Sequence, residues 1–340
     1  MGLGKSKILS QAASGVDASF GIVTYQTDGS YDNITGVGFQ PDLVWIKRRN
    51  GGGNHYLFDS VRGVHKAIFP DESYDQADNG NYLTAFESDG FALGSAAAGA
   101  NSALVGNGNT YVAWNWKAGG AASSNTNGTI TSSVSANQDA GFSIVKYTAT
   151  GTTATVGHGL SSAPELILSK TTSAAYDWLV YAAPVGETKQ MRLNANTAAA
   201  TSGFMNNTAP TSSVYTVASG NNMNYANGDI NVAYCFTSIS GYQKIGSYTG
   251  QTSGVTITTG FRPRFIMVKA SQSTYVENWA ILDTVRGSGK CLNPNLAGAE
   301  SDSALNTFTV SDTGFSFPHQ STADAMLNEN GYEYIYLAIA

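Results

Sequence analysis

Histidine and cysteine are the residue types that most often hold metals or act as acids, bases and nucleophiles. Such sites are usually recognised by short fixed spacings, for example two histidines four residues apart. This chain has no such spacing and no histidine close to a cysteine; the residues concerned are His55, His65, His158, His319, Cys235 and Cys291. We therefore predict no metal site, a small buried hydrophobic role for Cys235 and a free thiol for Cys291.

One run of the sequence, 71–78, is rich in carboxylates: Asp71, Glu72, Asp75 and Asp78. Calcium takes carboxylate and carbonyl oxygens, but the run lacks the central glycine and the closing glutamate of an EF-hand loop. We expect a solvated loop, with calcium binding as the alternative.

A second acidic pattern recurs. Asp59 precedes Arg62 and Asp283 precedes Arg286, each within a loop that ends in Val-Arg-Gly. A glycosidase needs two carboxylates facing each other across a cleft, whereas a recurring Asp and Arg in different surroundings favours a structural loop anchor. The chain also lacks a nucleophile elbow and a glycine-rich phosphate loop. We therefore predict no catalytic residues, no cofactor and no enzyme.

Composition excludes further classes of protein. The net charge is −6 and charged residues make up 12% of the chain, so the basic patch that nucleic-acid binding requires is missing. Two cysteines are too few for a disulfide framework. No apolar run approaches a transmembrane helix and no signal peptide is apparent, so we expect a chain that folds in a cytoplasm and has no membrane span.

The strongest pattern is a phrase that occurs three times, at 39–47, 163–170 and 261–269. Each copy is a proline-led apolar strand ending in lysine, and each is preceded by a short alternating segment and followed by a strand with an aromatic residue at its head. Tyr56, Trp178 and Trp279 are matched as these aromatic residues. Short strands with frequent turn signals predict an all-β fold of three tandem antiparallel β-sandwich (jelly-roll-like) domains of about 100 residues.

The predicted organisation is an N-terminal arm at 1–19, repeats at 20–119, 141–241 and 242–340, and a Gly/Ser/Asn-rich linker at 120–140. Because a linker separates only the first two repeats, we expect a compact second and third repeat with the first set apart. The three repeats are predicted to lie around a pseudo-threefold axis or, alternatively, in a row.

Asn-Gly turns stand directly before the closing strand of each repeat, so that strand is predicted to be the second arm of a hairpin. The closing strands carry Trp114 and Trp116 in the first repeat and Tyr234 and Phe236 in the second. Because these aromatic positions recur, we assign them to the core and not to a sugar platform.

Tyrosines that do not recur are better candidates for contact with a ligand. Four lie in variable polar loops of the kind that form recognition surfaces: Tyr74, Tyr82, Tyr225 and Tyr275. No particular ligand is indicated.

Several strings in the second and third repeats, namely 207–215, 233–236, 246–250 and 259–265, resemble a repeated domain of uncharacterised function found in tail-fibre-like and virion structural proteins of mainly marine tailed bacteriophages. The resemblance covers about residues 20–340. It implies a virion structural protein and supplies no catalytic residues.

The leading hypothesis is therefore a tail fibre or receptor-binding adhesin that contacts the host cell surface. The alternative is a capsid decoration protein anchored to the head by residues 1–19, and a weaker one is an enzyme that degrades host polysaccharide. The expected partners are other tail or capsid proteins, a glycan or protein of the host surface, and further copies of the chain. The expected location is the virion, made and assembled in the host cytoplasm.

Overall fold

The structure, a computed structural model, describes residues 9–10, 19–95, 102–272, 277–319 and 326–340. It confirms the all-β prediction, because the strands that form its sheets pair antiparallel and helix is limited to short pieces such as α1 (Ser102–Val105) and η3 (Ala304–Asn306). Apart from Leu9, Ser10 and Ser19, the predicted N-terminal arm lies outside the described residues.

Each repeat builds one long inner sheet in the same order. The closing strand lies in the middle, between the opening strand and the proline-led strand, and the strand that follows the proline-led strand forms one edge. The strands, in sheet order, are β2 (Phe20–Gln26), β10 (Thr110–Trp116), β4 (Leu43–Arg48) and β5 (Tyr56–Asp59), then β13 (Phe142–Thr148), β20 (Ile230–Phe236), β15 (Leu166–Thr171) and β16 (Leu179–Ala182), and finally β21 (Gln243–Thr249), β29 (Glu333–Ile339), β23 (Phe265–Gln272) and β24 (Ala280–Asp283).

A smaller outer sheet covers each inner sheet. The outer strands are β3 (Asp32–Thr35), β9 (Gly90–Leu93) and β8 (Leu83–Glu87), then β14 (Ala154–Gly157) and β19 (Val214–Val217), and then β22 (Val255–Thr258), β28 (Gly314–Phe317) and β27 (Thr309–Ser311). Two-stranded ribbons add β6 (Lys66–Ala67) with β7 (Ala77–Asp78), β17 (Lys189–Gln190) with β18 (Ala200–Thr201), and β25 (Lys290–Cys291) with β26 (Ser301–Asp302). These are unequal sandwiches, and they differ from a jelly roll, which has eight strands in two sheets.

The central and proline-led strands of each inner sheet are buried on both faces, which explains why they are largely apolar, whereas the edge strand β21 is more polar and has exposed residues. In β4, Val44 and Ile46 pack into the first repeat's own core, while Leu43 and Trp45 face the other way. Because successive side chains of a strand point to opposite faces, a sheet that is covered on both faces needs apolar residues at nearly every position.

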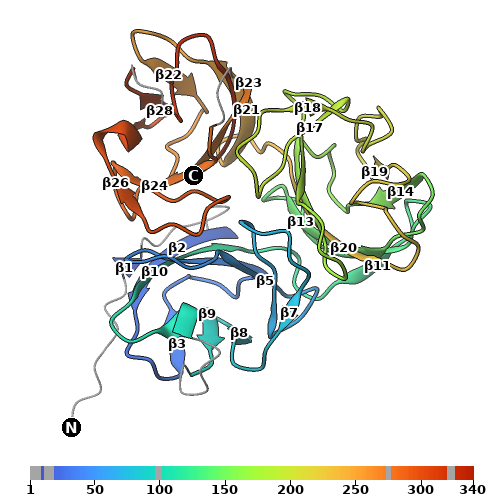
Figure 1. Cartoon of the computed structure of the whole chain (residues 1–340), viewed down its shortest axis with the longest axis horizontal. Helices are drawn as coiled ribbons and strands as arrows, with labels where there is room; N and C mark the ends of the chain where they lie inside the picture. Colours follow the sequence, from blue (N-terminus) through green and yellow to red (C-terminus); the bar gives the residue numbers. More distant parts are fainter. Residues whose placement is uncertain (1–8, 11–18, 96–101, 273–276, 320–325) are drawn as a thin grey trace.

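The second face belongs to a central core that all three repeats share. Figure 1 shows the repeats as lobes around a common centre, blue to cyan, green to yellow, and orange to red. Aromatic rings join the lobes there: Trp116 lies 6.4 Å from Phe236 of the second repeat and 5.7 Å from Phe265 of the third, measured between ring centroids. The repeats therefore share one core in addition to the core that each has alone.

The expectation that the first repeat is set apart is wrong. It donates a hydrogen bond from the indole Nε1 of Trp114 to Asp283 of the third repeat and accepts one from the Tyr234 hydroxyl of the second. A further bond joins the second and third repeats, from Trp279 Nε1 to the carbonyl oxygen of Arg192. The linker composition was misleading because contacts across the shared core, and not the length of the connection, hold the first repeat in place.

The predicted linker at 120–140 contains two strands. β11 (Ser123–Asn125) and β12 (Ser132–Asn137) extend the second inner sheet beyond β13, where Val134 pairs with Val145. The short strand β1 (Leu9–Ser10) pairs with the corresponding edge of β2. The segment before β21 is too short for such a strand, and the Ser238 hydroxyl accepts a hydrogen bond from the Ile245 N–H instead.

The Asn-Gly turns before the closing strands exist, but the predicted hairpins do not. Gly108, Gly228 and Gly331 have φ of 73°, 95° and 80°, the left-handed region that favours glycine. The strands that follow pair with the opening and proline-led strands of their repeats and not with the preceding segment. A turn signal fixes the local direction of the chain, but it does not say which strand becomes the neighbour.

Candidate functional site

The recurring Asp and Arg form buried ion pairs at the contacts between repeats. Arg62 Nε lies 2.5 Å from Asp59 Oδ2, and the same distance separates the equivalent atoms of Arg286 and Asp283. Burial disfavours the charged guanidinium, but the Asp59 charge and the Tyr234 hydroxyl nevertheless raise the pKa of Arg62. The Tyr234 hydroxyl donates to Asp59 Oδ2 at 2.7 Å.

The loop that holds each pair needs a glycine. Gly63, Gly186 and Gly287 all have φ near +90°, and the N–H of each donates to the carbonyl oxygen four residues earlier. Each loop is thus a fixed turn, and the carboxylate oxygens of Asp59 and Asp283 already accept hydrogen bonds from the arginine of the same loop. This arrangement is a structural anchor, and the two acids do not face each other across a cleft.

The third contact of this kind, between the third and second repeats, is apolar. By strand pairing, Ala182 stands where Asp59 and Asp283 stand, and Leu337 stands where Tyr234 and Trp114 stand. Both residues belong to the central core, with Val185 packed against it. Donor and acceptor are therefore present together or replaced together.

A second set of bonds links each repeat to the next. Trp178 Nε1 donates to Phe69 O at 2.8 Å and Trp279 Nε1 to Arg192 O at 2.9 Å. Strand pairing shows that the equivalent position in the first repeat is His55, so the match with Tyr56 was wrong by one residue. His55 Nε2 lies 3.0 Å from Asn293 O and takes the place of the indole nitrogen.

His55 is locked in this link. Its Nδ1 accepts from the indole N–H of Trp45 at 2.9 Å, which leaves Nε2 as the N–H donor toward Asn293 O. Complete burial, and then the charge of Lys47, hold the pKa of His55 well below its usual range. It is a neutral structural histidine and not a metal ligand or a catalytic base.

The other histidines lie elsewhere in the fold. His158 bonds within its own repeat, with Nε2 3.1 Å from Thr211 O. His65 lies in the loop after Gly63 with φ of 68°, and His319 is exposed beyond β28. Within the described ranges, no three His, Cys, Asp or Glu side chains gather as metal ligands would.

The acidic run is divided between the interior and solvent. Asp71 is buried and its Oδ1 accepts the His55 N–H at 3.0 Å, whereas Asp75 and Asp78 are exposed. Burial raises the pKa of Asp71 to about 7. A carboxyl group that is protonated for much of the time near neutral pH is a poor calcium ligand, so burial and the bond to His55 favour a structural role for Asp71.

Three buried lysines occupy the ends of the proline-led strands, a recurrence that was not interpreted from the sequence. Two of them cross to a neighbouring repeat: Lys47 Nζ donates to Ala297 O and Lys269 Nζ to Asn196 O, both at 3.2 Å. Lys170 Nζ donates to the carbonyl oxygens of Thr171 and Ala174. Burial lowers the pKa of each of the three to about 8.

Both cysteines are free and fully buried, as predicted for Cys235. Burial raises the pKa of each thiol to about 12, so little thiolate forms at neutral pH. We expect both thiols of the native chain to resist a thiol reagent such as dithionitrobenzoate at pH 8 and to react promptly in guanidinium chloride. Fast labelling of the native protein would contradict the buried placement.

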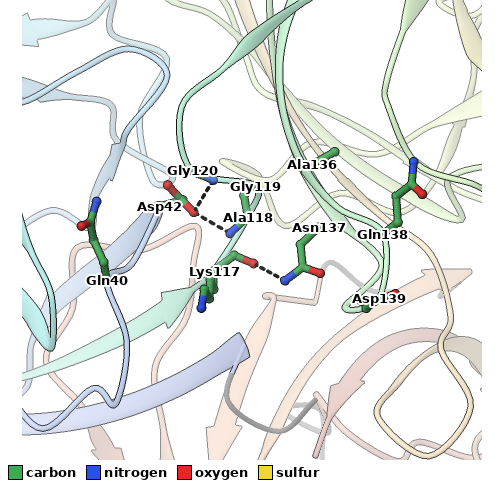
Figure 2. A pocket seen from close by; sticks show the side chains of 10 residues that line it. All are labelled: Gln40, Asp42, Lys117, Ala118, Gly119, Gly120, Ala136, Asn137, Gln138 and Asp139. Carbon is green, nitrogen blue, oxygen red and sulfur yellow. Dashed lines mark hydrogen bonds between the residues drawn. The ribbon is translucent and has the colours of Figure 1, made fainter. Parts of the chain in front are cut away.

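A polar pocket of about 650 Å³ lies between the first repeat and strand β12 (Figure 2). Its inner polar groups already bond to one another: Asp42 accepts from the N–H groups of Ala118 and Gly120, and Asn137 donates to Lys117 O. The remaining groups, including Lys117, Gln138 and Asp139, are exposed on its rim. The pocket lies where two parts of the fold meet, and most hydrogen-bonding capacity of its inner groups is already used within the protein.

The non-recurring tyrosines have different environments. Tyr82 packs edge-on against Tyr56 and Phe58, and Tyr275 lies outside the described residues. Tyr74 and Tyr225 are each 52% exposed. The ring next to Tyr225 is that of Tyr176, which is half-buried and lies 5.1 Å away between centroids. The ring next to Tyr74 is that of Phe69, which is buried. Of the two, Tyr225 is therefore the one with a second solvent-accessible ring beside it.

Fold and site together define an all-β protein in which three related β-sandwich repeats close around one core, with its exposed aromatic residues in peripheral loops. Residues 17–340 match the family described as "Domain of unknown function (DUF7483)", and the chain belongs to this family. Comparisons with curated proteins and with solved structures found no match. Across the described residues, no helix is long and apolar enough to cross a bilayer.

Proposed function

We propose that the chain is a structural protein exposed on a bacteriophage particle, where it acts as a tail-fibre or receptor-binding module that contacts the host cell. The resemblance of the sequence to virion structural proteins supports a place on the phage particle. The observation that carries the binding role is a difference between two sets of side chains. Recurring side chains such as Asp59, Trp178 and Lys269 lie buried at contacts between repeats, whereas the tyrosine pair outside the repeat pattern reaches solvent, with Tyr225 exposed and Tyr176 half-buried.

Capsid decoration is the second candidate. The three repeats close around a shared core, and this arrangement favours a compact knob. An extended fibre would need a shaft, whereas the inner sheets of this chain pack against one another at the centre of the molecule. A single chain with three similar lobes also suits a threefold position of a symmetric particle.

Cryo-electron microscopy of the intact particle tests these proposals directly. We expect density that fits the three-lobed chain at the tail. The same density on the head lattice would overturn the fibre proposal in favour of decoration, and absence of the chain from purified particles would contradict both. As an independent readout, an excess of the purified chain is expected to slow adsorption of the phage to its host.

A further inference from the structure

The pair formed by Tyr176 and Tyr225 is the strongest recognition feature outside the repeated scaffold. Tyr176 lies in the loop between β15 and β16, and Tyr225 lies in the loop before β20. Their rings are inclined by 51° with centroids 5.1 Å apart, so together they form a stepped aromatic surface. Tyr225 alone exposes 52% of its surface.

The two loops are fixed to one another before any ligand arrives. Ile230 N–H donates to Ser173 Oγ at 2.9 Å, and Thr172 N–H donates to Ile230 O at 2.7 Å. Asp229 accepts from Ser173 Oγ at 3.3 Å and from the Ala226 N–H at 3.2 Å. A platform that is already ordered loses less conformational entropy on binding, which favours affinity.

The pair does not recur in the third repeat. Asn224 and Asn328 have equivalent tasks, since each side-chain oxygen accepts the N–H that follows the opening strand, from Thr150 and Gln251 respectively. The next residue is Tyr225 in the second repeat and Glu329 in the third. The tyrosine therefore is not required by the scaffold that the two repeats share.

The surroundings indicate the chemistry of the ligand. The negative face of a tyrosine ring attracts the polarised C–H groups on one face of a pyranose ring, and the phenol hydroxyls can bond to sugar hydroxyls. Asp229, which lies close to Tyr176, adds carboxylate oxygens as acceptors at the edge of the platform. Asp229 next to Tyr176 is negatively charged, which disfavours acidic sugars.

Resting on the proposed function, we propose that Tyr176 and Tyr225 form a binding platform for a neutral glycan of the host cell envelope. The third repeat lacks this platform, because Glu329 stands where Tyr225 stands in the second repeat.

The test uses the full chain with two probes, intact host cells and the purified neutral surface polysaccharide of the same host. Tyr225→Ala and Tyr176→Ala are each expected to weaken binding to both probes by roughly tenfold or more, the loss typical of an aromatic hot spot. Tyr31→Ala and Tyr74→Ala are matched controls, because these tyrosines are 55% and 52% exposed, and both are expected to bind like the wild type. All four variants should melt near the wild-type temperature, since the changes are at the surface.

The outcomes separate the site from the function. Wild-type affinity in both platform variants would overturn the site and leave the adhesin proposal standing. Binding to cells but not to the polysaccharide would overturn the glycan as ligand. A wild-type chain that binds neither probe would contradict the adhesin proposal and the platform together.

Discussion

Replacing Asp59 by alanine is expected to lower the free energy of unfolding by about 3–5 kcal/mol, the usual cost of removing one partner of a buried ion pair. The carboxylate is fully buried and takes Arg62 Nε at 2.5 Å, the Arg62 backbone N–H at 2.8 Å and the Tyr234 hydroxyl at 2.7 Å. Its loss removes the acceptor of the Arg62 Nε–H and of the Tyr234 hydroxyl, and it leaves the buried guanidinium without its counter-charge. Thermal and denaturant unfolding followed by circular dichroism measure the change.

The protein contains its own control for this prediction. The equivalent contact of the third repeat with the second uses Ala182, Val185 and Leu337 in place of Asp59, Arg62 and Tyr234. The triple variant Asp59→Ala, Arg62→Val and Tyr234→Leu copies that apolar solution and is expected to recover much of the lost stability, because no charge or hydroxyl is left unpaired.

A second control is the exposed pair of Asp312 and Arg262. Asp312 has 94% of its side chain exposed and lies 3.4 Å from the guanidinium, so Asp312→Ala should cost less than about 1 kcal/mol. An Asp59→Ala variant as stable as Asp312→Ala would contradict the anchoring role. So would a triple variant less stable than the single one.

The repeat in the sequence was sufficient to place the inner strands. The closing strands align without a gap, and the structure pairs Trp114, Tyr234 and Leu337 with the equivalent residues of the proline-led strands. The reason is physical: the closing and proline-led strands are buried on both faces, so their apolar pattern is constrained at nearly every position and survives in all three copies.

Matching by residue type failed where the buried face was uncertain. Tyr56 was aligned with two tryptophans because all three are aromatic, but backbone pairing places His55 there. A shift by one residue reverses the face of a strand. Tyr56 accordingly packs into the core of the first repeat, whereas His55 reaches the third repeat through Asn293 O.

Edge strands and contacts between loops could not be predicted from the sequence either. β12 is rich in serine and has the composition of a linker, yet it pairs with β13 over six residues. Tyr225 could be selected because it does not recur, whereas Tyr176 could not, since the contact depends on two loops that are distant in the sequence. The available signal was a second tyrosine in a variable polar loop.

Asp71→Asn is expected to remove a loss of stability that the wild type shows between about pH 4 and pH 7. Burial raises the pKa of Asp71 to about 7, so in this window the folded chain holds a proton that the unfolded chain has released. The free energy of unfolding therefore falls by at most about 4 kcal/mol as the pH rises through the window, and this contribution is constant above it.

Asparagine also suits the site. Asn194 and Asn295 occupy the equivalent positions. Each accepts the backbone N–H of the tryptophan that stands just before β16 or β24, Trp178 or Trp279, as Asp71 accepts that of His55. Their amide N–H groups donate to Asp177 and Asn278, whereas the buried Asp71 Oδ2 has no hydrogen-bond partner among the described residues. An amide at position 71 keeps the acceptor, supplies a donor and cannot ionise.

The decisive measurement is the difference in unfolding free energy between Asp71→Asn and the wild type from pH 4 to pH 8. His55, whose depressed pKa costs stability as the pH falls below its unfolded value, is present in both proteins, so its effect largely cancels. Lys47 and Glu72 also face Asp71. In the asparagine variant the lost attraction to Lys47 lowers stability at high pH, and the lost repulsion from Glu72 raises it. We expect near equality at pH 4 and a more stable variant at pH 8; a difference that does not change with pH would show that Asp71 is ionised in the fold.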